Sequence, residues 1–359
     1  MMNLADATWP LAAFLITVAV VPLLSFLARR IGLVDRPGGR KHHEGNIPLI
    51  GGLAVLPVFL ALGFGGGFLN ITEHWTLLAG ALLLLFTGAW DDHSHINPKL
   101  KFIVHIMVAF LVVHHGGAQI YTLGDVFGWG EVRLYYLSET FTILAVVLLM
   151  NAVNLVDGLD GLSGGKCLVM FGWLMAGAAL AGLWPVFWLL AIIVAALAGF
   201  LSYNMRHPLR SKASIFMGDA GTLSLGLVLA WFCIDLTQGT DAALPPVSVA
   251  WILGLAVIDA IAQLIRRICE GKHPFYADRG HFHHHFVDEG MDAGKATALI
   301  TAMTFIFGGI GVVPFIMGWP MAWVSILWLA VLAAHIYLSL KPQRYRALLS
   351  RLLWMKKQG

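Results

Sequence analysis

Long apolar runs dominate the chain and constrain its fold more than any other feature. A helix needs roughly 20 apolar residues to cross a bilayer, and eleven runs approach that length: 8–28, 48–68, 75–90, 102–115, 138–153, 167–183, 185–203, 220–237, 246–265, 297–317 and 320–340. The chain is 58% hydrophobic and 12% charged, whereas soluble domains carry about 25% charged residues. We therefore predict an all-α polytopic membrane protein with about eleven transmembrane helices.

Basic residues fall almost entirely on one side of such a fold. With eleven spans, 22 of the 23 Lys and Arg residues share one side, and only Arg133 falls on the other. Loops rich in Lys and Arg stay in the cytoplasm, so we expect a periplasmic N-terminus and a cytoplasmic C-terminus. Residues 1–340 would form a single transmembrane catalytic domain, and 341–359 a solvated basic tail that anchors to anionic headgroups.

A polar, glycine-rich stretch, NAVNLVDGLDGLSGG at 151–165, follows the fifth run. Its Asp157 and Asp160 are three residues apart, and on a helix both carboxylates would share one face. Charged groups are costly at membrane depth and commonly mark functional sites. A glycine-rich turn between two membrane helices would explain the pattern without any chemistry, so the location of other acidic residues decides between the two interpretations.

Further acidic residues fall on the same side of the predicted topology. Asp91 and Asp92 end the third run, Asp219 lies in FMGDAG before the eighth, and Asp259 lies within the ninth. Neighbouring carboxylates repel each other unless a cation compensates, and Mg²⁺ or Mn²⁺ prefers such oxygen ligands, often shared with substrate phosphates. Each acid alone could be a helix cap, and Asp259 could simply pair with a neighbouring helix. Together they predict an active site at the cytoplasmic face.

Histidines are concentrated in HPFYADRGHFHHHF, residues 273–286. His283, His284 and His285 are consecutive and follow Arg279 closely. We expect them to lie on a loop and to hydrogen-bond phosphate or pyrophosphate, assisted by Arg279. Zinc binding is an alternative, but structural zinc usually takes cysteines, and catalytic zinc usually takes ligands at helical spacing. Structural packing is the third interpretation. The basic stretch at 35–52 could steer a diphosphate substrate toward the cation.

Five stretches, in the same order along the chain, resemble the polyprenyl-phosphate N-acetylhexosamine-1-phosphate transferases. They are RPGGRKHHEGNIPLIGG (36–52), DD (91–92), NAVNLVDGLDGL (151–162), FMGDAGTLSLG (216–226) and HFHHH (281–285). The resemblance implies a multi-pass enzyme of the bacterial inner membrane. Such an enzyme moves a sugar-1-phosphate from a UDP-sugar to undecaprenyl phosphate, releases UMP, and needs Mg²⁺, for which Mn²⁺ can substitute.

The resemblance also implies roles for individual residues. Asp219 matches the family's Mg²⁺ ligand, and Asp91, with Asp92 beside it, matches the residue proposed to deprotonate the lipid phosphate. Asn154, Asp157 and Asp160 match residues on the nucleotide and metal side of the family's site. Phe216 matches an aromatic that can stack on uracil, and His283 and His284 match histidines at the phosphates. Arg279, His285 and Lys101 are also expected to bind substrate.

Two branches of the family compete for this sequence. RKHHEGNIPLIGG favours the branch that loads GlcNAc-1-phosphate for O-antigen, common-antigen or teichoic-acid glycans, whereas His285 keeps the phospho-MurNAc-pentapeptide transferase as the alternative. A cation-coupled transporter would be built from symmetric halves, and the sequence shows no internal repeat. The expected partners are therefore a UDP-sugar, undecaprenyl phosphate and membrane lipids, with no nucleic acid; a homodimer is left open.

Overall fold

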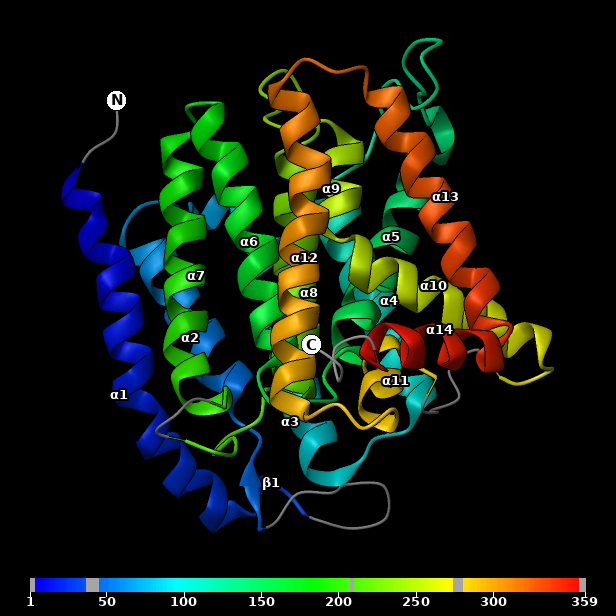
Figure 1. Ribbon diagram of the computed structural model, residues 1–359. Coiled ribbons are helices and arrows are strands. Elements are labelled where there is room, and N and C mark those ends of the chain that lie inside the picture. Colours follow the sequence, from blue (N-terminus) through cyan, green and yellow to red (C-terminus); the bar gives the residue numbers. More distant parts are fainter. Residues whose placement is uncertain (1–3, 37–44, 207–209, 274–279, 355–359) are drawn as a thin grey trace.

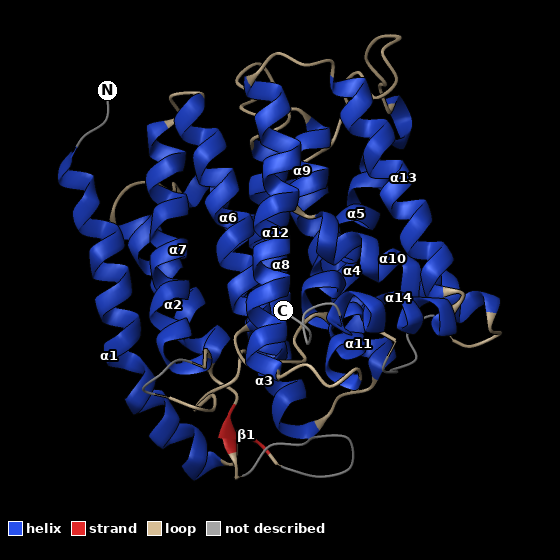
Figure 2. Cartoon of the chain, in the orientation of Figure 1, coloured by secondary structure: helices blue, strands red, loops and turns tan. Residues whose placement is uncertain are grey.

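The computed structural model describes residues 4–36, 45–206, 210–273 and 280–354. Most of this part is helical, and its only sheet has two short strands (Figure 2). The long helices run side by side through the height of the molecule, and the connecting segments gather at its two ends (Figure 1). The predicted all-α fold is confirmed, while its orientation across the membrane stays a prediction.

Nine helical stretches in the described chain are long and apolar enough to cross a membrane. They are built on α1 (Thr8–Ile31, preceded by the turn Leu4–Ala7), α3 (Ile71–Ser94), α4 (Pro98–Phe110, continued by a π-helix at Leu111–His115), α5 (Ser138–Leu155, preceded by the turn Tyr135–Leu137), α6 (Leu162–Leu180), α7 (Trp184–Asn204), α8 (Gly218–Asp235), α12 (Ala293–Ile316) and α13 (Met321–Ser339).

Two of the eleven predicted spans have a different form. The run at 48–68 contains α2 (Gly51–Gly65), whose 15 residues are too few for a full crossing. The run at 246–265 is divided into α9 (Pro246–Ile252) and α10 (Gly254–Cys269), which meet at 77°. The described chain thus has nine spans, or ten if the bent pair counts as one, where the sequence predicted about eleven. The length of an apolar run predicts how far a segment can extend through a membrane, but it does not reveal a bend within the segment.

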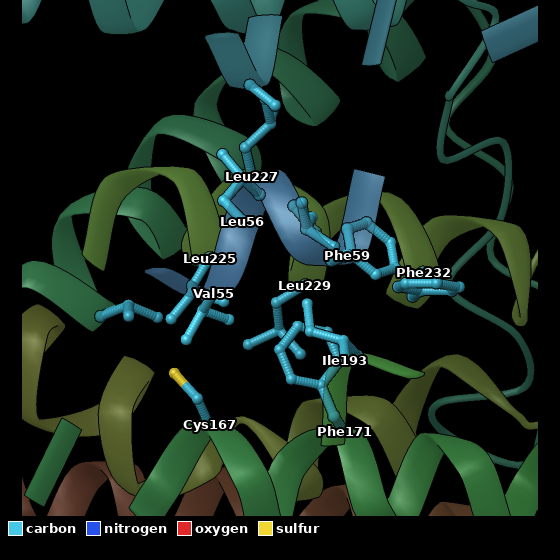
Figure 3. Close-up of a cluster of buried hydrophobic side chains, with 14 of the residues drawn as sticks. Val55, Leu56, Phe59, Cys167, Phe171, Ile193, Leu225, Leu227, Leu229 and Phe232 are labelled. Atoms are coloured by element: carbon cyan, nitrogen blue, oxygen red, sulfur yellow. The ribbon is translucent and has the colours of Figure 1, made fainter. Parts of the chain in front are cut away.

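Helix α8 is the most buried of the nine spans, and α2, α3 and α5 contact it. Glycines let these neighbours approach closely. A Cβ on Gly226 of α8 would lie 2.6 Å from Met150 Cα in α5, and a Cβ on Gly88 of α3 would overlap the α8 backbone at Ala220. Figure 3 shows the apolar core beside α8, where Phe59 of α2 and Phe171 of α6 contact its Phe232 edge to face. The ends of α3, α5 and α8 are thereby held together.

Short elements lie at one end of the bundle, at the bottom of Figure 1. Strands β1 (Val34–Asp35) and β2 (Ile47–Pro48) pair antiparallel. Helices α11 (Phe282–Asp288) and α14 (Pro342–Trp354) lie nearby, and α11 contacts both α12 and α14. The tail was expected to be solvated, but over α14 it is helical, with Tyr345 and Leu349 buried against the rest of the protein.

Candidate active site

A pocket of about 1250 Å³ lies at the end of the bundle that carries the two strands and α11. Sites for small molecules typically measure about 300–1,000 Å³, so this one has room for a substrate larger than a drug-sized molecule. Its wall comes from both strands, the end of α3, the turn between α5 and α6, the segment before α8, and α11. Seven predicted site residues line it: Asp91, Asp92, Asp157, Asp160, Phe216, Asp219 and His284.

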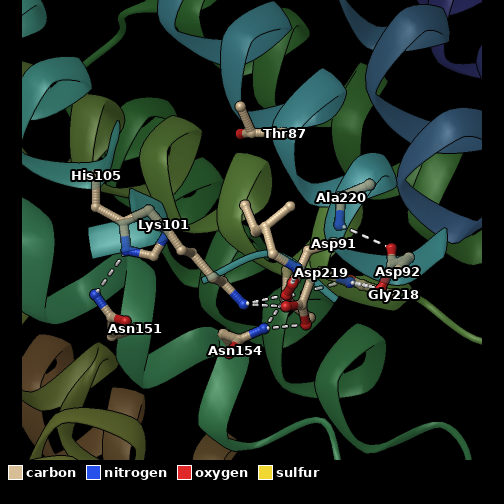
Figure 4. Close-up of polar contacts among 12 residues, drawn as sticks. Thr87, Asp91, Asp92, Lys101, His105, Asn151, Asn154, Gly218, Asp219 and Ala220 are labelled. Atoms are coloured by element: carbon tan, nitrogen blue, oxygen red, sulfur yellow. Dashed lines mark hydrogen bonds and ion pairs between the residues drawn. The ribbon is translucent and has the colours of Figure 1, made fainter. Parts of the chain in front are cut away.

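The close contact of α3 with α8 explains the geometry of FMGDAG. Asp92 lies in the last turn of α3 and caps α8, because its Oδ1 accepts from the Asp219 amide at 2.9 Å and its Oδ2 from the Ala220 amide at 3.2 Å (Figure 4). Gly218 has φ +72°, a conformation that side chains disfavour, and a Cβ there would lie 2.5 Å from Asp92 Oδ2. Asp219 was expected in a loop before the span; it lies instead in the first turn of α8.

Side chains from α4 and α5 contact Asp219 of α8 (Figure 4). Lys101 of α4 forms an ion pair with it and a second ion pair with Asp91 of α3 at 3.0 Å. Asn154 of α5 donates to Asp219 Oδ1 at 2.7 Å and to Thr222 at 2.9 Å. The structure therefore brings Asp91, Lys101 and Asn154 together around Asp219, as expected of a shared site.

The atoms around Lys101 have the chemistry of a divalent-cation site. Carboxylates of Asp91 and Asp219, from two helices, converge on one ammonium group. Proteins usually hold Mg²⁺ through one or two carboxylates, with water and substrate phosphates completing the shell. Within the described ranges, no group of three or more His, Cys, Asp or Glu side chains is arranged to hold a metal without such help. The two carboxylates fit an ion that is shared with a phosphate substrate.

Asp157 and Asp160 lie in the turn between α5 and α6, so the expectation that they share one face of a helix was wrong. The glycines around them end α5 before Asp157. Asp157 accepts from the Ser163 hydroxyl at 2.6 Å, and Asp160 forms an ion pair with Arg206 at 2.8 Å. Surrounding protein raises the pKa of Asp157 to about 6, against the opposing effect of the Ser163 hydroxyl.

Phe216 is held by the strand region. Its backbone forms an isolated bridge with Leu49, its amide donates to Pro48 O at 2.9 Å, and its carbonyl accepts from Gly51 N at 2.9 Å. These bonds tie the segment before α8 to the start of α2 and leave Phe216 in the pocket wall. An aromatic ring in that position can stack on a planar ligand.

The histidines lie on α11, not on a loop as predicted, so consecutive side chains diverge. His284 lines the pocket, and the buried His283 lies against Gly158 in the turn after α5. His285 is not in the pocket lining; its ring lies 4.5 Å from that of Tyr345 in α14. Burial, with the neighbouring His284, holds the pKa of His283 well below its usual range, so its imidazole is neutral. Arg279 falls outside the described residues.

Several basic pocket residues were not singled out from the sequence: Arg29, His93, His95, Arg206 and Lys212. In the stretch DDHSHINPKLK, His93 and His95 closely follow the acidic pair, and this position could have identified them as site residues. Arg206 and Lys212 lie between α7 and α8 and resemble any other positively charged loop of a membrane protein. Only their place in the fold distinguishes them.

Comparison with known proteins agrees with this geometry. The family model described as glycosyl transferase family 4 matches residues 74–237, a range that includes Asp91, Asp92 and Asp219. The undecaprenyl-phosphate alpha-N-acetylglucosaminyl 1-phosphate transferase of Escherichia coli (strain K12) is 33% identical over 345 residues, covering 94% of this chain and 91% of the relative. The proteins of that name from Yersinia pestis and Haemophilus influenzae are 34% and 33% identical, over 84% of this chain and 82% and 84% of their own.

Identity of this extent over most of both chains is a result of common descent, and it confirms what the five sequence stretches indicated. The chain belongs to the polyprenyl-phosphate N-acetylhexosamine-1-phosphate transferases of glycosyl transferase family 4.

Proposed function

We propose that this protein transfers GlcNAc-1-phosphate from UDP-GlcNAc to undecaprenyl phosphate and releases UMP, starting a lipid-linked glycan at the bacterial inner membrane. The observation that carries the proposal is the convergence of Asp91, Lys101 and Asn154 on Asp219 at one end of a membrane bundle. A water-soluble donor and a lipid acceptor can both reach such a place. The names of the relatives support the same acceptor and sugar.

In the proposed reaction, an oxygen of the lipid phosphate attacks the β-phosphorus of the UDP-sugar. The bond from that phosphorus to the bridging oxygen breaks, and UMP leaves with the electron pair. Asp91 would take any proton from the acceptor. Its Oδ1 accepts from the Ile96 amide and its Oδ2 pairs with the Lys101 side chain, whereas both oxygens of Asp92 are tied to backbone amides of α8. A phosphate monoester loses its second proton with a pKa of about 6, so this step matters most below neutral pH.

Positioning and charge neutralisation dominate phosphoryl transfer. Asp219 would hold Mg²⁺, or Mn²⁺ in its place, and such an ion would neutralise charge on the diphosphate and on the departing UMP. Asn154 fixes the orientation of Asp219 before substrate arrives. Lys101 balances both carboxylates in this structure.

The rest of the pocket would hold the donor. Phe216 would stack on uracil, and His284, which also lines the pocket, would hydrogen-bond the diphosphate, with Arg279 a further candidate. Asp157 and Asp160 would shape the nucleotide side of the pocket. Asp160 is already paired with Arg206, so it adds little negative charge to repel the donor.

The test is release of labelled UMP by the purified protein, with undecaprenyl phosphate, Mg²⁺ and a panel of UDP-sugars that includes UDP-MurNAc-pentapeptide. We expect UMP release with UDP-GlcNAc, no release without the lipid phosphate, and loss of release on chelation. Arg133→Gln, which changes a basic residue that does not line the pocket, serves as a matched control. Release with UDP-MurNAc-pentapeptide alone would assign the protein to the other branch, and no release with any UDP-sugar would overturn the proposal.

A further inference from the structure

A second polar cluster lies outside the pocket lining and is centred on Asp259 of α10. Asp259 is only 4% exposed. Its Oδ2 lies 2.9 Å from His281 Nδ1, and its Oδ1 accepts from the Phe282 amide at 3.1 Å. His335 of α13 is a more distant partner, with Nε2 at 3.4 Å from Oδ1. One buried carboxylate thus joins α10 and α13 to the first residues of α11.

The second ring nitrogen of His281 is also occupied. Its Nε2 lies 3.2 Å from Nη2 of Arg267, a group that can only donate. Nε2 must therefore accept, and Nδ1 carries the proton that His281 donates to Asp259. With both nitrogens bonded, the imidazole cannot rotate without leaving a buried polar atom unpaired, which would destabilise the protein.

Helix α11 depends on such contacts for its position. It has seven residues, and isolated helices shorter than about 12 residues are marginal in water. Asp259 bonds the residue that precedes the helix and the first residue inside it. One or two residues further along, His283 lies against Gly158 and His284 lines the pocket. A rotation of α11 about its axis would move both imidazoles.

We propose that Asp259 is a positioning residue, which sets the rotation of α11 and so presents His284 to the phosphates of the donor. The inference rests on the proposed function, because it assumes that His284 binds those phosphates. Asp259 itself does not line the pocket. Its effect on the reaction must therefore pass through α11.

A double-mutant cycle tests this route. Asp259→Asn keeps an oxygen for the Phe282 amide but loses the negative charge that His281 and His335 share. In the otherwise native protein we expect kcat/KM for UDP-GlcNAc to fall about 10- to 100-fold, the range seen when a partner that orients a functional imidazole is removed. In a His284→Asn protein the same change should lower it less than about threefold, because residues that act as one unit are non-additive.

A purely structural role makes the opposite prediction: equal losses in both backgrounds would overturn the proposal. Ser248→Ala is the matched control, since it removes another buried hydrogen bond, 2.7 Å to Gly311 O, between α9 and α12. It should lower the melting temperature and leave KM for the donor unchanged. If Asp259→Asn does not accumulate, His281→Asn takes its place in the same cycle.

Hydrogen exchange gives a readout that does not depend on catalysis. In Asp259→Asn we expect faster exchange of the amides of α11, with exchange in α8 unchanged. Unchanged exchange in α11 would overturn the proposal even if activity fell. If the native protein transferred no sugar phosphate, the proposed function would fail while faster exchange in α11 would still support the role of Asp259 in placing that helix.

Discussion

The pocket has two unlike walls. The acidic wall consists of Asp91, Asp92 and Asp219, and Lys101 and Asn154 support it by contacting Asp219. It is built at the ends of long membrane helices that pack directly on one another. The histidine wall is α11, a seven-residue helix held by Asp259 at its start and by α14 at its side. The charges proposed to act on the transferred phosphate are thus fixed by the bundle itself, whereas the histidines depend on a few side-chain contacts.

The largest effect should come from the acidic wall. Asp219→Asn keeps the shape of the side chain and an oxygen for Asn154, but it removes the charge that pairs with Lys101. We expect turnover to fall by at least about 10³-fold, the upper range for loss of one electrostatic contact in an active site. The measurement is UMP release from protein matched for its amount in the membrane. Activity within tenfold of the native protein would remove Asp219 as a metal ligand.

The α3–α8 contact should be the next most sensitive feature. A Cβ on Gly88 would overlap the backbone of α8 at Ala220, and backbone cannot turn aside as a side chain can. We expect Gly88→Ala to lower the free energy of unfolding by about 1–3 kcal/mol, as overpacking does, and to displace Asp92 from the amides that it caps. Gly172→Ala is the matched control, because a Cβ there meets nothing within 4 Å. Equal melting temperatures for the two variants would contradict the close approach.

On the histidine wall, neighbouring residues should behave differently. His284→Asn should raise KM for the donor about tenfold or more, since a hydrogen bond to a charged group contributes about 1.5–3 kcal/mol. His285→Asn should lower the melting temperature and leave KM within about twofold, because the ring of His285 packs on Tyr345 and does not line the pocket. Donor kinetics and thermal unfolding of both variants separate the two roles. A raised KM in His285→Asn, with an unchanged KM in His284→Asn, would assign donor binding to His285 instead.

The same contrast appears in what the sequence could predict. Asp91, Asp92 and Asp219 could be brought together from the sequence, because each lies at the end of a long apolar run and the predicted topology put these ends on one face. Their partner Lys101 was expected at the site, but its contact with both Asp91 and Asp219 follows from how α3, α4 and α8 pack, which no local pattern records.

Short elements were predicted less well. Asp157 and Asp160 have helical spacing, yet glycines end the helix before them, and HFHHH has no apolar periodicity strong enough to mark α11 as a helix. The bend between α9 and α10 lies inside a continuous apolar run. The sequence did not decide whether Asp259 belongs to the site or pairs with a neighbouring helix, because its bond to His281 joins residues 22 apart in sequence. Such contacts depend on tertiary structure alone.

The smallest expected effect concerns Asp157, which lies in the turn between the two walls. Asp157 lines the pocket and is partly open to solvent, but the protein around its carboxylate raises its pKa from 3.8 to about 6. The folded protein therefore binds this proton more tightly than the unfolded chain does. The resulting stabilisation is complete below pH 4 and is lost as the pH rises through about 6. Asp157→Asn keeps an acceptor for Ser163 but carries no charge at any pH. Its melting temperature relative to the native protein should therefore rise between pH 4 and 6. A constant difference over that range would show that ionisation of Asp157 does not destabilise the folded protein.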